Sequence, residues 1–132
     1  KKRDFWMPFA PTLLAERADD YLVNPKGHFA PYMVIAFPTK PAAWDAFPAA
    51  LHPRDKSTRP QMLLEDWEPT YYRIIKEFEE RTGVPVLLNT SFNLHGDPIV
   101  CTPQDALYTF LNSELDALAL GKWLIYRRNP PG

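Results

Sequence analysis

The sequence predicts an α/β domain in which helices and strands alternate along the chain, and three segments carry this prediction. Residues 69–82 are the clearest helix, with a proline at the start, a glycine after the end and an apolar stripe at helical spacing: Tyr71, Ile74, Ile75 and Phe78. Residues 84–88 are an apolar run that stops abruptly at the polar residues 89–91, as a buried strand does when it ends in a site. Residues 102–105 read Thr-Pro-Gln-Asp, which places Thr at the N-cap, Pro at N1 and Asp at N3 of a further helix.

The segments before the long helix predict shorter elements. Residues 12–20 are expected to form a helix with Thr12 as its N-cap, and residues 24–27, Asn-Pro-Lys-Gly, to form a turn. The apolar residues 32–37 lie between two prolines and fit a strand that is buried on both faces. Small residues and prolines dominate residues 39–50, which predicts an irregular excursion anchored by aromatic side chains.

The remaining segments complete a mixed sheet flanked by helices. A polar turn at residues 55–60 leads into a strand over residues 61–64. On the long helix, Glu79 is expected to face solvent. Residues 97–100 predict a short extended piece, and the helix after it should end near residue 112 with this core stripe: Ala106, Leu107, Phe110 and Leu111. One further strand or two are expected at the segments that flank Gly121, residues 117–120 and 123–126.

Composition is that of an ordinary globular domain. The 132 residues carry 15 Lys and Arg against 16 Asp and Glu, a net charge of -1 that weighs against a nucleic-acid binder. The single cysteine, Cys101, excludes an internal disulfide and is expected to be a buried small hydrophobe. No cluster has metal-ligand spacing, and no apolar run has the roughly 20 residues that a membrane span needs. A single cytoplasmic domain, residues 1–132, without a metal site is therefore expected.

The polar residues after the apolar run are the first candidate site. Asn89, Thr90 and Ser91 offer an amide, two hydroxyls and successive backbone N–H groups at the end of a strand, where α/β sheets commonly hold ligands. Neutral donors of this kind suit phosphate or carbonyl oxygens. The alternative is a local turn in which these side chains bond only to their own backbone.

Cations and a histidine elsewhere in the chain could complete an anion site. Arg59 lies in the polar turn before a predicted strand, and Lys1 and Arg3 open an aromatic-rich segment. An Arg would bind phosphate oxygens through two bonds and a Lys would act as a mobile point charge, if they converge on Asn89. His52 precedes the same turn and could donate to an anion. The alternatives are solvated surface charges and a structural histidine.

Four ordered motifs, which cover nearly the whole chain, then identify it by resemblance with a known family. They are Lys1-x-Arg3-Asp4-x-Trp6-x-Pro8-Phe9-Ala10-Pro11, Arg59-Pro60-Gln61, the run from Gly83 to Asn93, and Gly96-Asp97-Pro98-Ile99-Val100. Together they resemble the C-terminal domain of the O-carbamoyltransferases of nodulation-factor and antibiotic biosynthesis. Met7 departs from the pattern, since the family typically has Arg there.

The resemblance implies a fold, a reaction and partners. It implies a YrdC-like domain that follows an N-terminal Kae1-like domain, which this chain lacks, so that residues 1–132 would be a fragment of a longer enzyme. The implied reaction is the conversion of carbamoyl phosphate and ATP, with Mg²⁺, into carbamoyl adenylate, followed by transfer of the carbamoyl group to a substrate hydroxyl. Transfer would take place in the absent domain, where the bound metal is commonly iron. The isolated domain is expected to have partial activity or none.

Carried over by motif, the resemblance assigns roles to the residues already named on chemical grounds. These residues would together hold carbamoyl phosphate and the nucleotide phosphates in line and neutralise developing charge: Lys1, Arg59, Asn89 and Ser91. Of the four, Lys1 and Arg59 are the expected catalytic residues as well as substrate contacts. Thr90 and His52 are the further candidate substrate contacts. No protein nucleophile is needed.

Two other readings remain open at this point. YrdC-like folds also occur with a basic concave face, so the chain could be a non-catalytic nucleotide- or RNA-binding module. It could also be a structural cap whose apolar surface docks on the absent domain.

Overall fold

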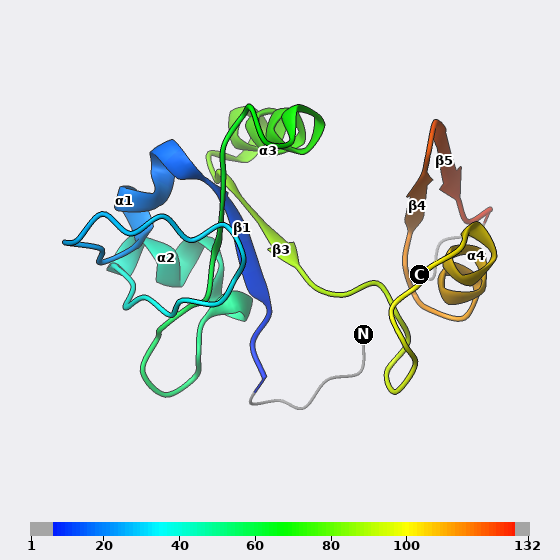
Figure 1. Cartoon of the computed structure of the whole chain (residues 1–132), viewed down its shortest axis with the longest axis horizontal. Coiled ribbons are helices and arrows are strands. Elements are labelled where there is room, and N and C mark those ends of the chain that lie inside the picture. The colour runs from blue at the N-terminus through cyan, green and yellow to red at the C-terminus, as the bar shows by residue number, and fades with distance from the viewer. Residues whose placement is uncertain (1–6, 129–132) are drawn as a thin grey trace. The chain divides into compact units, whose positions relative to one another are not determined.

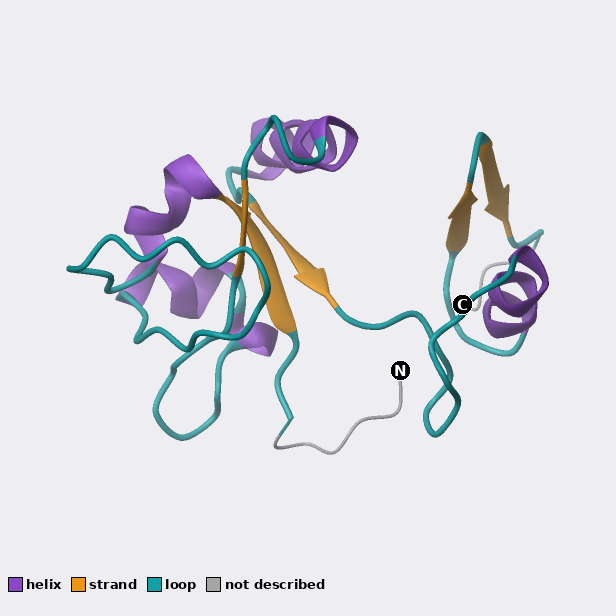
Figure 2. Cartoon of the chain, in the orientation of Figure 1, coloured by secondary structure: helices purple, strands orange, loops and turns teal. Residues whose placement is uncertain are grey.

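The computed structural model describes residues 7–128, which divide into two compact units at Thr90 and Ser91. The predicted α/β class is confirmed, with a mixed three-stranded sheet in the first unit and a two-stranded sheet in the second (Figures 1 and 2). We describe each unit by itself.

The sheet of the first unit has the strand order β2-β1-β3. The central strand β1 (Ala10–Leu14) runs parallel to β2 (Gln61–Leu63) and antiparallel to β3 (Val86–Asn89). Thr12 lies opposite Gln61, and Ala10 lies opposite Asn89. The first residues of β1 and β2 and the last residue of β3 therefore lie at the same end of the sheet, which we call the Asn89 end.

Helices cover both faces of this sheet because successive strand side chains point to opposite sides. On one face Leu13, Met62 and Val86 pack against α1 (Ala18–Tyr21) and α2 (Pro41–Ala46). On the other face Leu14 and Leu63 pack against Ile75 of α3 (Pro69–Thr82). Figure 1 shows α1 and α2 together on one side of β1, away from α3. The sheet is thus sandwiched between two helical layers.

Of three elements predicted before residue 38, two are wrong and one is confirmed. The helix expected over residues 12–20 is the strand β1, followed by the 3-10 turn η1 (Ala15–Arg17) and the short α1, so Thr12 is a strand residue and no N-cap. Residues 32–37 form no strand: Tyr32, Val34 and Ile35 are exposed, whereas Phe37 is buried and makes an isolated bridge to Thr58. The turn at residues 24–27 is confirmed by the bond from Gly27 N–H to the Asn24 carbonyl, 3.0 Å.

Residues 39–50 are more regular than predicted, because two prolines there begin helices. They form α2, with Pro41 at its start, and the 3-10 turn η2 (Pro48–Ala50). Proline suits a first helical position, since its fixed φ fits the helix and its missing N–H would have no helical partner there. Prolines in this segment therefore start helices where composition alone indicated a loop.

The bounds of α3 are as predicted, but its buried stripe is not. Gly83 ends the helix in the left-handed conformation, φ 76°, and its N–H donates to the Glu79 carbonyl at 2.7 Å. Ile75 is fully buried, whereas Ile74 is 52% exposed and Phe78 is also exposed. The buried face is rotated toward Tyr71 and Tyr72, which pack on the cluster of Leu14, Leu63 and Ile75.

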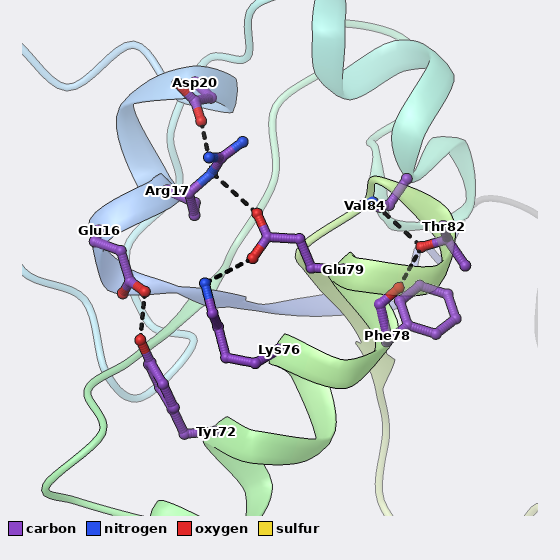
Figure 3. A network of polar contacts seen from close by, with 9 residues as sticks. All are labelled: Glu16, Arg17, Asp20, Tyr72, Lys76, Phe78, Glu79, Thr82 and Val84. Carbon is purple, nitrogen blue, oxygen red and sulfur yellow. Dashed lines mark hydrogen bonds and ion pairs between the residues drawn. The ribbon is translucent and has the colours of Figure 1, made fainter.

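Glu79 lies at the centre of a polar network, contrary to the prediction that it faces solvent (Figure 3). One carboxylate oxygen lies 3.4 Å from Arg17 Nε and the other 2.9 Å from Lys76 Nζ. The buried Arg17 Nε also lies 2.9 Å from an Asp20 oxygen. This network, together with a hydrogen bond from the Tyr72 hydroxyl to Glu16, ties α3 to the segment that follows β1.

The Tyr72 hydroxyl provides a test of this network by pH. Its hydrogen bond to the Glu16 carboxylate raises the pKa of Tyr72 to about 12 from 10.0. Because the pKa is higher in the folded chain, the contact stabilises the fold fully below pH 10, and this contribution is lost as the pH rises from about 10 to about 12. In a titration of phenolate absorbance, the transition that Tyr72→Phe removes should therefore lie near pH 12. Glu16→Gln should move that transition toward pH 10. If Tyr72 of the wild-type chain already titrated near pH 10, the contact with Glu16 would be contradicted.

The second unit is one helix packed on a hairpin. The helix α4 (Pro103–Leu111) begins with the predicted capping box, in which Asp105 N–H donates to the Thr102 hydroxyl and Thr102 N–H to the Asp105 carboxylate. The strands β4 (Ala117–Leu120) and β5 (Trp123–Tyr126) are antiparallel and have the predicted bounds. One small core joins helix and hairpin: Ala106, Phe110 and Leu118, with Phe92, Leu120 and Ile125 beside them.

Residues 97–100, expected as a short extended piece, are not part of a strand. Two details of the second unit differ from prediction. Leu107 and Leu111 are exposed, because Thr109 takes the buried position beside Ala106 and Phe110. Cys101 is exposed and free, so it is no buried hydrophobe. None of the helices described in either unit is long and apolar enough to cross a membrane.

Candidate functional site

Three polar side chains from three strands meet at the Asn89 end of the sheet. The Thr12 hydroxyl donates to Gln61 Oε1 at 2.9 Å. Asn89 Nδ2 donates to the same Gln61 oxygen and to Thr12 Oγ1, both at 3.0 Å. We call these three residues the amide triad.

Strand register explains why the triad forms. Thr12 and Gln61 are direct partners across β1 and β2, so their side chains leave the same face of the sheet. Asn89 lies on that face as well, two residues after Leu87, which pairs with Thr12. Leu14 and Leu63 share the face and are covered by α3. The triad is thus the continuation of an α3-covered apolar face, at the point where it becomes polar.

The triad is buried at Thr12 and accessible at Gln61 and Asn89. Thr12 is fully buried, whereas Gln61 and Asn89 are half-buried. Within residues 7–128, no hydrogen bond engages Gln61 Nε2 or Asn89 Oδ1, and neither atom is closed off from solvent. These two atoms are available to a ligand.

Arg59 lies two residues before Gln61 on a clamped backbone. Thr58 is buried, its hydroxyl donates to the Ala50 carbonyl at 2.7 Å, and its backbone exchanges two bonds with Phe37 at 2.9 and 3.0 Å. Pro60 on the other side is also buried. Arg59 itself is exposed. A guanidinium is therefore carried by a fixed stretch of chain at the Asn89 end of the sheet.

His52 belongs to the turn that precedes Arg59. Its Nδ1 lies 3.1 Å from Asp55 Oδ1, and that oxygen also accepts from the backbone N–H and hydroxyl of Ser57, at 2.9 and 2.7 Å. The Ser57 backbone bond is the main reason why the pKa of Asp55 is lowered, and the carboxylate is therefore ionised at neutral pH. A neutral His52 then carries its proton on Nδ1 and presents Nε2 as an acceptor.

The predicted site residues are brought together only in part. Arg59 and Asn89 share one end of the sheet, and the exposed Thr90 directly follows Asn89. Ser91 belongs to the second unit, where its hydroxyl donates to Asn93 Oδ1 at 2.7 Å. Among residues 7–128, no hydrogen bond joins His52 to the triad. Lys1 lies outside the described residues. The roles assigned to all these residues stay predictions.

Two members of the triad were missed from the sequence. Thr12 stands where an N-cap threonine would precede a helix, and this local signal conceals its place in a strand. Gln61 stands in the Arg59-Pro60-Gln61 motif, and that motif was the available signal. Only the pairing of β1 with β2 shows that Thr12 and Gln61 face each other.

Besides the triad, residues 7–128 contain an apolar groove but no group of metal ligands. An apolar groove of about 330 Å³ lies beside β3 and is lined only by apolar residues, Phe47, Phe78 and Leu88 among them. Within residues 7–128, no three His, Cys, Asp or Glu side chains gather in a way that could hold a metal ion. The amide triad contains no carboxylate either.

Comparison with known proteins adds a family. Residues 1–127 match the protein family described as carbamoyltransferase C-terminus. An uncharacterized protein of Methanocaldococcus jannaschii is 48% identical over 94% of this chain, which corresponds to 24% of that protein. Nodulation protein NolO of Bradyrhizobium diazoefficiens is 37% identical over 97% of this chain and 23% of its own length. Nodulation protein U of Rhizobium tropici is 38% identical over 73% of this chain and 16% of its own length. The chain thus spans about a quarter or less of these relatives.

Proposed function

The chain belongs to the carbamoyltransferase C-terminus family, and from this premise we propose that it carries the carbamoyl phosphate and ATP site of an O-carbamoyltransferase. The product of this half-reaction is carbamoyl adenylate, which carbamoylates a substrate hydroxyl. The isolated chain binds the two substrates but does not complete the transfer.

One observation supports this proposal above the others, namely that Arg59, Gln61 and Asn89 share one end of a rigid sheet. A guanidinium beside neutral amide groups suits a ligand that joins a phosphate to an uncharged polar group. Lys1, Thr90 and Ser91 would add phosphate contacts, as the family resemblance implies. His52 would offer a further contact from the turn before Arg59, as a donor to the phosphate only when both ring nitrogens carry a proton.

The chemistry asks for positioning and charge neutralisation. Carbamoyl phosphate, ATP and one water give carbamoyl adenylate, phosphate and pyrophosphate, so atoms balance without a covalent protein intermediate. Arg59 would hold phosphate oxygens and compensate negative charge as the bonds to phosphorus change. Mg²⁺ would accompany the nucleotide and neutralise its phosphates.

The rest of a longer protein would supply the acceptor half. The relatives described above are about four times as long as this chain or longer. We propose that an N-terminal domain, with its own bound iron, holds the hydroxyl acceptor and receives the carbamoyl adenylate. The use of ATP favours a cytoplasmic location.

Binding calorimetry on the 132-residue chain tests the proposal. Carbamoyl phosphate should bind, with and without a non-hydrolysable ATP analogue, and Arg59→Ala should weaken it by about 10- to 100-fold, since a hydrogen bond to a charged group contributes about 1.5–3 kcal/mol. Arg81→Ala is the matched control, because it removes the same charge from a side chain that is 79% exposed on α3. Its affinity should equal that of the wild type.

The other outcomes point to the other readings. Affinity for RNA that falls steeply with salt would indicate a nucleic-acid module in place of the enzyme half. A folded chain that binds neither carbamoyl phosphate nor RNA would indicate a structural cap. Equal weakening by Arg59→Ala and Arg81→Ala would mean that net charge, and no site at Arg59, attracts the ligand.

A further inference from the structure

We propose that Gln61 and Asn89 recognise the carbamoyl group itself, with Thr12 as the residue that positions both amides. This inference rests on the proposed function and deepens it, because it separates recognition of the carbamoyl group from recognition of the phosphate. Arg59 would bind the phosphate, and the amide triad would bind the carbamoyl group that is attached to it.

Hydrogen-bond accounting within the triad leaves one donor group and one acceptor. The two N–H groups of Asn89 Nδ2 are both used, one on Thr12 Oγ1 and one on Gln61 Oε1. Both lone pairs of Gln61 Oε1 are used as well, by Thr12 and Asn89. What remains is Gln61 Nε2, a donor, and Asn89 Oδ1, an acceptor, on two amides joined by a 3.0 Å bond.

The result does not depend on which way the amides are turned. If both were turned over together, Gln61 Nε2 would donate to Thr12 and Asn89, and Thr12 would donate to Asn89 Oδ1. All three contacts would remain satisfied, and the outer atoms would again be one donor and one acceptor. Turning only one amide would set two oxygens or two nitrogens against each other at 3.0 Å.

A donor beside an acceptor is complementary to a planar carbamoyl group. That group carries a carbonyl oxygen, which accepts, and an NH₂, which donates, on the same carbon. Inorganic phosphate offers oxygens to both positions and would leave the outer acceptor facing negative charge. An acetyl group has a methyl where the carbamoyl group has NH₂, so it would leave a polar atom of the triad unpaired, which costs free energy.

The neighbourhood of Arg59 favours carbamoyl phosphate over the other ligand of similar chemistry. The edge of adenine also shows a donor beside an acceptor, but a ribose separates it from the phosphates of ATP. In carbamoyl phosphate a single oxygen joins the two groups. Arg59 and Gln61 are two residues apart, so their Cα atoms lie within about 7 Å, and the side chain of Arg59 can reach a phosphate attached to a group bound by Gln61.

The test compares two ligands that differ in one group, carbamoyl phosphate and acetyl phosphate. The wild-type chain should bind carbamoyl phosphate about tenfold more tightly. Gln61→Met has a side chain of similar length without hydrogen-bonding amide atoms, and it should abolish this preference while acetyl phosphate binds as before. Gln104→Met on α4 makes the same exchange in the second unit and should keep the preference.

A second pair of variants covers the case in which Gln61→Met fails to fold. Thr12→Ser keeps the hydroxyl at the centre of the triad and should retain selectivity, whereas Thr12→Val removes the hydroxyl at nearly constant volume and should lose it. The readout is the ratio of the dissociation constants for acetyl phosphate and carbamoyl phosphate. A general loss of stability would weaken the binding of both ligands equally and leave this ratio unchanged.

Each outcome separates this inference from the proposed function. Equal affinity of the wild type for the two ligands, both dependent on Arg59, would overturn the inference and leave the phosphate site standing. Displacement of carbamoyl phosphate by adenosine would also overturn it, because Gln61 and Asn89 would then bind adenine. Binding of neither ligand would overturn the proposed function and this inference with it.

Discussion

Ile75→Ala is expected to lower the free energy of unfolding of the first unit by about 2–5 kcal/mol. Ile75 is the one fully buried residue of α3, and it fills the space between the helix and Leu14 and Leu63 of the sheet. Truncation leaves a cavity there, because the strands on either side are held by their own hydrogen bonds and cannot close it. Denaturant unfolding of the full chain, followed by tryptophan fluorescence, measures the change.

Ile74→Ala is the matched control on the same helix. Ile74 is 52% exposed, so its truncation should cost less than about 1 kcal/mol. The difference between the two variants therefore tests the rotation of the α3 face. Equal costs for the two would restore the stripe expected from helical spacing and contradict the packing described above.

Arg127→Met is expected to destabilise the second unit by roughly 3 kcal/mol, since hydrogen bonds to a charged group contribute about 1.5–3 kcal/mol. The guanidinium of Arg127 closes the C-terminal end of α4: it donates to the carbonyls of Phe110 and Ser113, to that of Leu115 at 2.9 Å and to that of Leu111 at 3.4 Å. Methionine keeps the apolar stem and removes all four bonds. A cation at a helix C-terminus also complements the helix dipole, and that term is lost as well.

Amide hydrogen exchange is the suitable measurement, because the chain has two units and one unfolding transition need not report on both. Protection should fall in α4 and the hairpin of β4 and β5 and stay unchanged in the first unit. Arg128→Met, at the exposed neighbouring position, should change protection little. Loss of protection to the same degree in both variants would show that charge alone, without the cap, stabilises α4.

Elements with their own end signals could be predicted from the sequence. The bounds of α3 follow from Pro69 and Gly83, and the start of α4 follows from the capping box of Thr102 and Asp105. In each case residues close together in the chain satisfy the backbone groups that a helix end leaves unpaired, so no distant contact is needed. The hairpin of β4 and β5 is local in the same sense, with Gly121 in its turn at φ 57°.

The first strand could not be predicted in this way. Residues 10–14 carry no local signal that separates a strand from a helix, since Thr12, Leu13 and Leu14 are all buried, on both faces of the sheet. Its conformation depends on β2 and β3, which lie far along the chain. The prediction over residues 32–37 is wrong for the opposite reason. An apolar run between two prolines favours a buried strand, but within residues 7–128 none of the strands pairs with it, and Val34 is exposed.

The sequence by itself determined the family of the chain, its α/β class, its two best helices and the pair of residues, Arg59 and Asn89, on which the proposed site is built. These follow from motifs and caps that short stretches of chain contain. Only the tertiary structure decided that Asn89 bonds to Thr12 and Gln61, because the three residues come from separate strands and meet through register. The orientation of the Asn89 amide, and with it the donor and acceptor offered to a ligand, is set by those two partners, since hydrogen-bond geometry across a sheet depends on which residues pair.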